Sequence, residues 1–331
     1  MRTFTLKGLF LTVLFVLLGS LAIQAADDGL MTKQITIKLD KAGTLPNRIS
    51  ESKKYLITNL KIVGEVNGTD WKFIREMAGC GYRFPEKTDG KLSILDLSDA
   101  KIVESGFAYI YVGYDVGCKY TYNDKLGDYA FYGCSSLTSL TIPSSVTSIG
   151  EWAFAGCSGL GNLTIPSSVT KIANHAFWGC SGLTSLVIPS SVTSIGESAF
   201  QECSGLTSLT IPSSVTSIDM NAFEDCSGLT SIYVYPEKLP KLGSDVFDGC
   251  DAKNCTVYVP TGTYDDYKVS EFGYFEKIVE FDATGINNVT TSTDAKEVSR
   301  YSPNGQRLSA PTRGLNIVKY SDGSVKKVVV Q

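Results

Sequence analysis

The 331-residue sequence contains a single histidine, His175. Any Ser-His-Asp or Cys-His catalytic site would therefore have to be built on this one residue. The sequence also lacks, in a supporting context, the HExxH zinc motif, the G-x-S-x-G nucleophile motif, the P-loop and the glycine fingerprint of dinucleotide sites. Carboxylate pairs such as Glu202 and Asp225 leave glycoside hydrolysis open, although a solvated face is the usual explanation for such acids. We predict a protein that is not an enzyme, with no catalytic residues, no metal site and no cofactor.

Blocks of like charge are absent as well, and the formal net charge is only -4. This charge balance does not support a nucleic-acid-binding surface or a polybasic membrane patch. Neutral or weakly charged partners fit it better.

No apolar run is long enough to span a membrane. The stretch from Gly8 to Leu18 follows Arg2 and Lys7, and it is shorter than the ~20 residues that a bilayer requires. This layout is typical of a secretory signal peptide, which we place at residues 1–25 with cleavage after Ala25. No cysteine lies near that point, so a lipid anchor is not indicated. We predict an exported protein, located at the cell surface or outside the cell.

What the sequence does have is an internal repeat with a period of twenty-three, the step from Phe131 to Phe154. One phenylalanine and one cysteine recur at this step and are the expected core columns: Phe131, Phe154, Phe177, Phe200 and Phe223, and Cys134, Cys157, Cys180, Cys203 and Cys226. The next step, from Phe223 to Phe247, is longer by a single position.

Each repeat unit predicts a short strand, a corner, a second extended piece and a tight turn back. In the first unit Pro143 should end the strand, because proline has no N–H to give to a sheet. One turn cannot bury its apolar face alone, so the turns must stack through backbone hydrogen bonds. The predicted fold class is a repeat solenoid with stacked parallel strands. The apolar positions of this unit are Leu137, Leu140, Ile142, Val146, Ile149, Ala153 and Phe154.

The pattern C-x-x-L-x-x-L-x-I-P-x-x-V-x-x-I-x-x-x-A-F resembles the BspA-type leucine-rich repeat of bacterial surface proteins, from Leu126 to Phe281. The resemblance implies a secreted or cell-surface protein that binds other macromolecules, often in adhesion, with no catalytic residues to carry over. The tail is similar to the short C-terminal module of many exported Bacteroidetes proteins, and it has strand runs separated by Asn-Gly and Asp-Gly turns. Whether it is a secretion signal or a stabilising hairpin unit stays open.

The flanks of the repeat predict a cap at each end. The pairs Leu60/Ile62 and Leu95/Leu97 have the strand spacing of divergent first turns. A short helix is expected between these pairs, with Thr69 or Asp70 as its N-cap and Gly79 as its stop. A helix or tight loop at Tyr264 to Phe275 should close the other end. The expected segments are a signal peptide (1–25), an N-terminal cap (26–125), the solenoid (126–281), a linker (282–297) and a C-terminal β module (298–331).

Nine cysteines in an exported chain suggest a disulfide framework, but five of them form one column. We interpret this column as a ladder of buried free thiols. Zinc is disfavoured, because its ligands must converge on one point. If any bridge forms, Cys250–Cys255 and Cys80–Cys118 are the candidates.

Aromatic side chains cluster on the returning edge of the first turns. Tyr129, Trp152 and His175 share one column, and Tyr132 and Trp178 share another. These five residues are the candidate ligand-binding residues, because adjacent aromatics with polar tips suit sugars or a protein hot spot. The alternative is an apolar collar packed against the N-terminal cap. The sheet face, by contrast, presents short hydroxyl side chains and is nearly featureless.

The leading functional prediction is a non-catalytic protein that binds a protein or glycan of a host or neighbouring microbe through the solenoid. The alternatives are a structural surface or stalk protein without a specific ligand, and a carbohydrate-binding or glycan-hydrolysing protein. An ice-type binder acting through the Thr/Ser ladder is a further alternative, against which Gly161 and Val187 argue because they interrupt that ladder.

Overall fold

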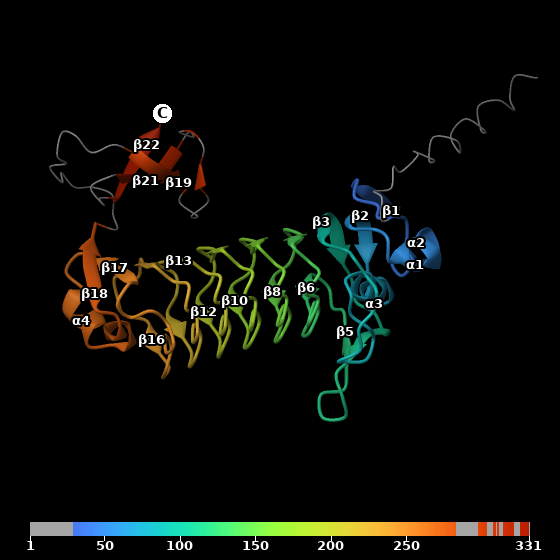
Figure 1. The fold of residues 1–331 in the computed structure, drawn as a ribbon, viewed down its shortest axis with the longest axis horizontal. Coiled ribbons are helices and arrows are strands. Elements are labelled where there is room, and N and C mark those ends of the chain that lie inside the picture. Colours follow the sequence, from blue (N-terminus) through green and yellow to red (C-terminus); the bar gives the residue numbers. More distant parts are fainter. Residues whose placement is uncertain are drawn as a thin grey trace, which may run out of the picture.

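The chain folds into a solenoid of stacked turns with a cap at each end (Figure 1). The structure is a computed structural model that describes residues 29–282, 297–302, 307–308, 310, 314–320 and 325–330. The predicted signal peptide with its cleavage point, and residues 283–296 of the predicted linker, lie outside the described residues. The predicted fold class is confirmed: stacked parallel strands form a solenoid, and a small antiparallel sheet follows it.

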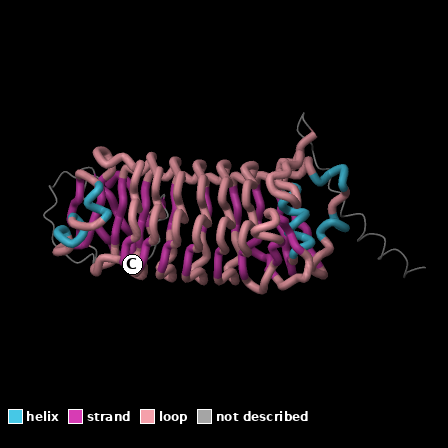
Figure 2. The backbone as a smooth tube through the Cα atoms, turned by 90° about the horizontal axis from the view of Figure 1, so that it is seen from below, coloured by secondary structure: helices cyan, strands magenta, loops and turns pink. Residues whose placement is uncertain are grey.

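Two parallel sheets run along the solenoid, and Figure 2 shows its turns side by side. The long sheet has ten strands in chain order: β1 (Ile35–Leu39), β2 (Asn59–Val66), β3 (Ile94–Ile102), β7 (Ser139–Thr141), β9 (Asn162–Thr164), β11 (Ser185–Val187), β13 (Ser208–Ile211), β15 (Ser231–Val234), β17 (Thr256–Pro260) and β18 (Lys277–Phe281). The second sheet has six two-residue strands: β6 (Lys125–Leu126), β8 (Ser148–Ile149), β10 (Lys171–Ile172), β12 (Ser194–Ile195), β14 (Ser217–Ile218) and β16 (Lys241–Leu242).

The register between turns follows the sequence repeat. Leu140 pairs with Leu163, and Leu186 pairs with Leu209, each the equivalent position of the next repeat unit. Strand β7 ends at Thr141, two residues before Pro143, as the missing N–H of proline requires. The corner that follows is fixed by a hydrogen bond from the Val146 N–H to the Pro143 carbonyl, at 3.1 Å.

Phenylalanine rings form a continuous ladder through the core. Neighbouring rings in this column lie 5.0–5.8 Å apart between centroids, and their planes are within 13° of parallel. The widest spacing, 5.8 Å, falls between Phe223 and Phe247, where the repeat unit is one position longer. Such ring pairs contribute about 0.5–1.5 kcal/mol beyond their buried area.

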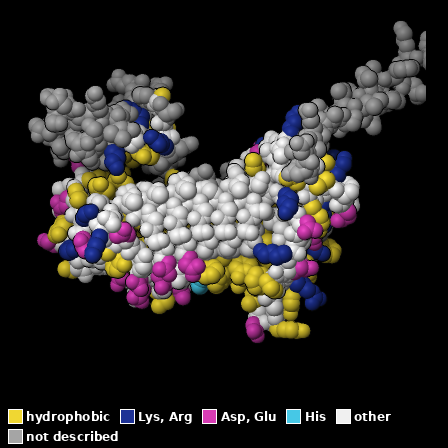
Figure 3. Space-filling model, in the orientation of Figure 1, with side chains coloured by type: hydrophobic (Ala, Val, Ile, Leu, Met, Phe, Trp, Pro, Cys, Tyr) yellow, Lys and Arg dark blue, Asp and Glu magenta, His cyan; other side chains and the backbone are white. Residues whose placement is uncertain are grey.

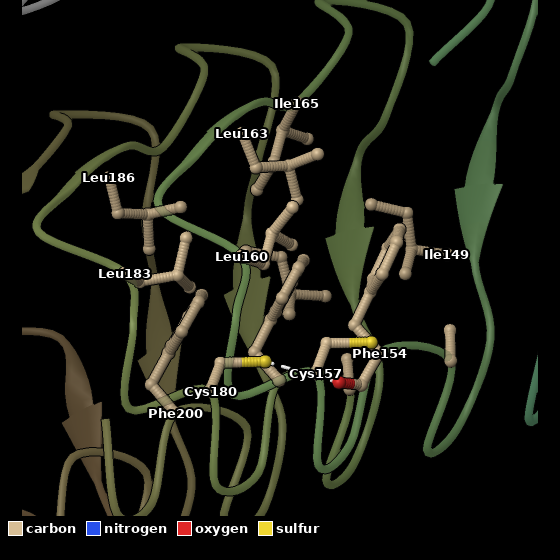
Figure 4. Close-up of a cluster of buried hydrophobic side chains, with 14 of the residues drawn as sticks. Ile149, Phe154, Cys157, Leu160, Leu163, Ile165, Cys180, Leu183, Leu186 and Phe200 are labelled. Carbon is tan, nitrogen blue, oxygen red and sulfur yellow. Dashed lines mark hydrogen bonds between the residues drawn. The ribbon is translucent and has the colours of Figure 1, made fainter. Parts of the chain in front are cut away.

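The cysteine column links each turn to the one before it. The Cys180 thiol donates a hydrogen bond to the Phe154 carbonyl at 3.1 Å (Figure 4). Four other thiols donate to the equivalent phenylalanine carbonyls at 3.1–3.3 Å: Cys157, Cys203, Cys226 and Cys250. A thiol is a weak donor that is small enough to lie in a close-packed core. The column therefore combines burial with a hydrogen bond between turns.

All nine cysteines lie among the described residues, and all are free thiols. Neither candidate bridge is formed. Cys80 contacts Cys134 instead of Cys118, and this contact, together with the charges of Arg75 and Lys87, lowers the pKa of the Cys80 thiol to about 6. The structure thus corrects the expected pairing of Cys80, because the cap places it against the first turn of the cysteine column.

The N-terminal cap contains α1 (Leu45–Arg48), α2 (Glu51–Lys54) and α3 (Gly68–Met77). Asn67 is the N-cap of α3, which corrects the expected Thr69 or Asp70. The Asn67 side chain accepts the Thr69 N–H, and the Asp70 carboxylate accepts the Asn67 N–H, both at 3.0 Å. This reciprocal pair satisfies two backbone donors that a helix start leaves free. Gly79 follows the helix with a φ of +87°, which suits a glycine stop.

A hairpin of β4 (Ala108–Tyr111) and β5 (Cys118–Tyr120) projects from the cap beside the first turns (Figure 1). At the other end, α4 (Tyr264–Lys268) and the 3-10 helix η2 (Glu271–Tyr274) cover the last turn, as predicted. The C-terminal sheet is antiparallel, in the order β20 (Arg307–Leu308), β19 (Glu297–Tyr301), β21 (Gly314–Tyr320) and β22 (Val325–Val330).

Candidate binding surface

The segments that lead from the second sheet back to the long sheet form one side of the solenoid, which we call the return edge. It comprises residues 127–134, 150–157, 173–180, 196–203, 219–226 and 243–250. Each segment turns through a left-handed residue whose φ lies between +50 and +59°. These residues form a column: Tyr129, Trp152, His175, Ser198, Asn221 and Asp245. Asparagine and aspartate tolerate this backbone well, whereas a bulky side chain in it is an outlier.

The five candidate residues come together on the first three segments of the return edge. We call this group, Tyr129, Tyr132, Trp152, His175 and Trp178, the aromatic ledge. The His175 ring stacks on Trp152 with centroids 4.1 Å apart and planes 4° from parallel, and Trp152 lies 6.2 Å and 9° from Tyr129. Tyr132 and Trp178 lie 6.1 and 6.0 Å from Trp152 at steeper angles. All five side chains are half-buried, so they form a surface and not a core.

Part of the ledge also packs against the N-terminal cap. Tyr132 meets Phe84 edge to face at 4.7 Å, and the Lys119 ammonium lies 5.6 Å from the Tyr129 ring centroid. The ring contacts of Trp152 are all with other ledge residues. The collar interpretation thus describes the two tyrosines, whereas Trp152 packs within the ledge itself.

A buried arginine of the cap holds the backbone under the ledge. Arg75 of α3 donates to the carbonyls of Tyr129 and Ala130 at 3.0 Å and to that of Tyr132 at 3.3 Å. The Trp71 indole N–H also donates to the Ala130 carbonyl, at 3.1 Å. The first turn of the ledge is therefore fixed in place before any partner binds.

Burial shifts the titration of the ledge residues. It lowers the pKa of His175 below 6.5, and the nearby carboxylates of Glu197 and Glu151 oppose this effect. Burial also raises the pKa of Tyr129 and of Tyr132. At neutral pH the ledge is therefore uncharged.

The later turns of the return edge are acidic, a feature that the sequence analysis missed. Figure 3 shows hydrophobic side chains gathered under the first turns and acidic side chains under the later ones. The six segments contain nine carboxylates and no lysine or arginine: Asp128, Glu151, Glu197, Glu202, Asp219, Glu224, Asp225, Asp245 and Asp248. The signal was present in the sequence, because these acids recur at repeat positions. We call the last seven, from Glu197 to Asp248, the acidic half.

Among the described residues, no salt bridge involves the acidic half. In the part of the chain that the structure describes, no lysine, arginine or histidine nitrogen lies within 4.0 Å of these seven carboxylates. Asp128, at the opposite end of the edge, does pair with Lys119 at 3.5 Å. Both residues line a hollow of about 460 Å³ between the hairpin and the first turn.

Glu202 and Asp225, the acids considered for glycoside hydrolysis, are both exposed on this edge. Within the described ranges, no group of three or more His, Cys, Asp or Glu side chains is placed to hold a metal ion. Among the same residues, no helix is long and apolar enough to cross a membrane.

Hydroxyl side chains of the sheet side take part in backbone hydrogen bonding. The Thr207 and Thr230 hydroxyls donate to the carbonyls of Thr184 and Thr207, one turn earlier, at 3.3 and 3.0 Å. The central face in Figure 3 is correspondingly without charge. These threonine hydroxyls are used in the stacking of turns, and the face that they form is uncharged. The return edge, with its aromatic and acidic side chains, is therefore the more distinctive surface.

Comparison with solved structures finds matches to proteins of bacteria. A leucine-rich-repeat protein of T. pallidum is 30% identical, with a TM-score of 0.33, and the match covers 40% of this chain and 66%, just under two thirds, of that protein. The pneumococcal vaccine antigen PcpA is 15% identical, with a TM-score of 0.40 and 69% of each chain covered. A leucine-rich cell surface protein of Faecalibacterium prausnitzii is 18% identical, with a TM-score of 0.30, covering 78% of this chain and 92% of that one.

A search of curated proteins found no significant match. The family comparison is more specific, because it matches the repeat units themselves in six copies. The matched units include all of the return edge and both columns of the core. Residues 124–254 of this chain match the family model described as the BspA type leucine rich repeat region.

Proposed function

We propose that the protein is an exported, non-catalytic binding protein that recognises a host or microbial macromolecule through its aromatic ledge. The observation that carries this proposal is the identity of the residues in the left-handed column. Asn221 and Asp245 suit that backbone, yet the first two turns place the bulky Tyr129 and Trp152 there. A left-handed backbone costs an L-residue roughly 1–2 kcal/mol. An outlier of this kind favours a functional role for the rings.

Half-burial of the ledge supports the same proposal. Protein-binding surfaces are enriched in aromatic residues that present a rigid, partly apolar area. The contacts from Arg75 to the Tyr129 and Tyr132 carbonyls hold this area in one geometry, which lowers the entropy lost on binding. Location at the cell surface agrees with the signal-peptide pattern of residues 1–25 and with the BspA-type repeats.

The proposal is tested by screening the purified chain on a glycan array and on a panel of extracellular-matrix proteins. The test variants are Trp152→Asn and Trp178→Ala. Asparagine is chosen at position 152 because Asn221 occupies the equivalent left-handed site, so the backbone is retained when the ring is removed. Met220→Ala is the matched control, because Met220 is an exposed apolar side chain on a later turn.

We expect binding that both tryptophan variants lose and the control keeps, with unchanged melting temperatures. Lowered melting with intact binding would assign the ledge to the collar. Binding to nothing on either panel would favour the structural surface or stalk protein.

A further inference from the structure

We propose that the partner is a basic polypeptide segment that carries a large apolar side chain. The apolar anchor packs on the aromatic ledge, and the basic residues lie along the acidic half of the return edge. This inference rests on the proposed function, since it names the partner of the same surface.

The orientation of the Trp152 ring disfavours a sugar at the centre of the ledge. A pyranose ring packs its C–H face flat against the face of an aromatic ring, so it needs an exposed face. The faces of Trp152 are turned toward His175 on one side, at 4.1 Å and 4°, and toward Tyr129 on the other, at 6.2 Å and 9°. Trp152, at the centre of the ledge, is therefore open to a partner at its ring edge and not at its faces, and edge-to-face packing is a preferred contact between aromatic side chains. The ledge suits the apolar side chain of a polypeptide.

The negative charge next to the ledge indicates that the partner is positively charged. Seven carboxylates on the last three segments carry no ion-pair partner among the described residues. A row of like charges raises the local concentration of the opposite charge and speeds its association. Lysine and arginine side chains fit this row, whereas nucleic acids, sulfated glycans and anionic lipids would be repelled.

The two parts of the surface lie in line on the same edge. His175 is on the third segment, and Glu197 and Glu202 are on the fourth, so the aromatic and acidic parts adjoin directly. Six segments at ~4.8 Å per turn span about 24 Å, the length of seven or eight extended residues. The β4–β5 hairpin stands at the aromatic end (Figure 1), which leaves the acidic end open for the rest of the segment.

Selection from a random peptide library, displayed on phage, tests this partner directly. The immobilised wild-type chain is the target, and a Trp152→Asn, Trp178→Ala double variant removes peptides that bind elsewhere. We expect recovered peptides that combine Lys or Arg with Phe, Trp, Leu or Met. Recovery of acidic peptides, or of peptides without charge preference, overturns the inference.

One enriched peptide is then synthesised and its Kd measured, at low and high ionic strength, through the fluorescence of Trp152 and Trp178. The triple variant E202Q/D219N/D245N removes three exposed carboxylates of the acidic half. The matched control is E65Q/E104Q/E237Q, which removes three exposed carboxylates elsewhere. We expect about tenfold weaker binding and a smaller salt dependence for the first triple variant only.

The outcomes separate the two proposals. Equal affinity of both triple variants overturns the basic partner. Failure to recover any peptide, together with glycan binding that depends on Trp152 and Trp178, keeps the ledge as a binding surface and replaces the polypeptide by a sugar. Failure of both screens overturns the inference and the proposed function together.

Discussion

The imidazole ring of His175 lies flat on the indole ring of Trp152, with centroids 4.1 Å apart and planes 4° from parallel. Both residues occupy the same left-handed position of consecutive turns, with φ of +55° and +57°. The repeat brings them into contact because the turns are stacked in register. The contact also removes water from one face of the imidazole, and this has a measurable effect on its titration.

His175 should titrate below its ordinary pKa of 6.5, since burial disfavours the charged ring more than Glu197 and Glu151 favour it. The folded pKa is then below the unfolded value, so protonation favours the unfolded chain. The contribution of His175 to the stability of the folded chain is therefore fully present above pH 6.5, and it is lost as the pH falls through the folded pKa. Because the chain has one histidine, an NMR titration of its imidazole proton measures the shift directly. A pKa above 6.5 would mean that the two glutamates outweigh burial.

Gly182→Ala should destabilise the solenoid by about 1–3 kcal/mol. A Cβ at position 182 would lie 2.3 Å from the Ser158 carbonyl oxygen of the preceding turn, so the stacking of turns would have to shift. Gly161→Ala is the matched control, because its Cβ would meet nothing nearer than 3.9 Å. Urea unfolding followed by circular dichroism compares the two. Equal losses would show that the close approach at Gly182 is relieved at little cost.

The repeat made most of the solenoid predictable. A core position that recurs once in every repeat unit must meet its own copy in the next turn, so the column at Phe154 implied a stack of rings. The C-terminal closure at Tyr264 to Phe275 was also found, because caps are expected to be atypical. The hydrogen bonds from the thiols of Cys157, Cys180, Cys203 and Cys226 to phenylalanine carbonyls were not anticipated, because they depend on how adjacent turns are offset.

Features without a periodic signal were harder to predict. Strand β1 was missed, since Ile35–Leu39 is a short alternating stretch without the repeat pattern. The N-cap of α3 was misplaced because Asn67, Thr69 and Asp70 are all suitable capping residues, and only the extended backbone of Asn67 distinguishes it. The lack of ion pairs to the acidic half among the described residues was also missed, because it depends on where the lysine and arginine side chains lie in the folded chain.

Thiol labelling should distinguish Cys118 from the cysteine column. Burial raises the pKa of Cys157 and Cys203 to about 12, so iodoacetamide at about pH 8 finds almost no thiolate there. Cys118 is half-buried, whereas Cys80 is buried despite its lowered pKa, so Cys118 should be labelled first. Mass spectrometry of the folded chain counts the modified sites, and Cys118→Ala should abolish the early labelling. Labelling of the column at the rate of Cys118 would contradict its burial, whereas labelling in guanidinium should reach all nine thiols.

Arg75→Met should loosen the N-terminal cap from the solenoid. The substitution keeps an apolar stem but removes donors from the carbonyls of Tyr129, Ala130 and Tyr132, which lie at 3.0–3.3 Å in the folded chain. The Trp71 indole still donates to the Ala130 carbonyl and the Tyr132 N–H still donates to the Tyr129 carbonyl, at 3.1 Å each. The Tyr132 carbonyl loses the donor it has in the folded chain, and an acceptor left in this state costs about 1–3 kcal/mol.

We therefore expect a loss of about 1–3 kcal/mol in the free energy of unfolding, measured in guanidinium. Lys72→Met, on an exposed part of the same helix, should cost less than about 1 kcal/mol. Limited proteolysis adds a positional readout, since a solenoid transmits stability between neighbouring turns. Cleavage in Arg75→Met should begin in the cap and the first turn, near Tyr129. Uniform cleavage along the repeats would show instead that the cap and the solenoid unfold as one unit.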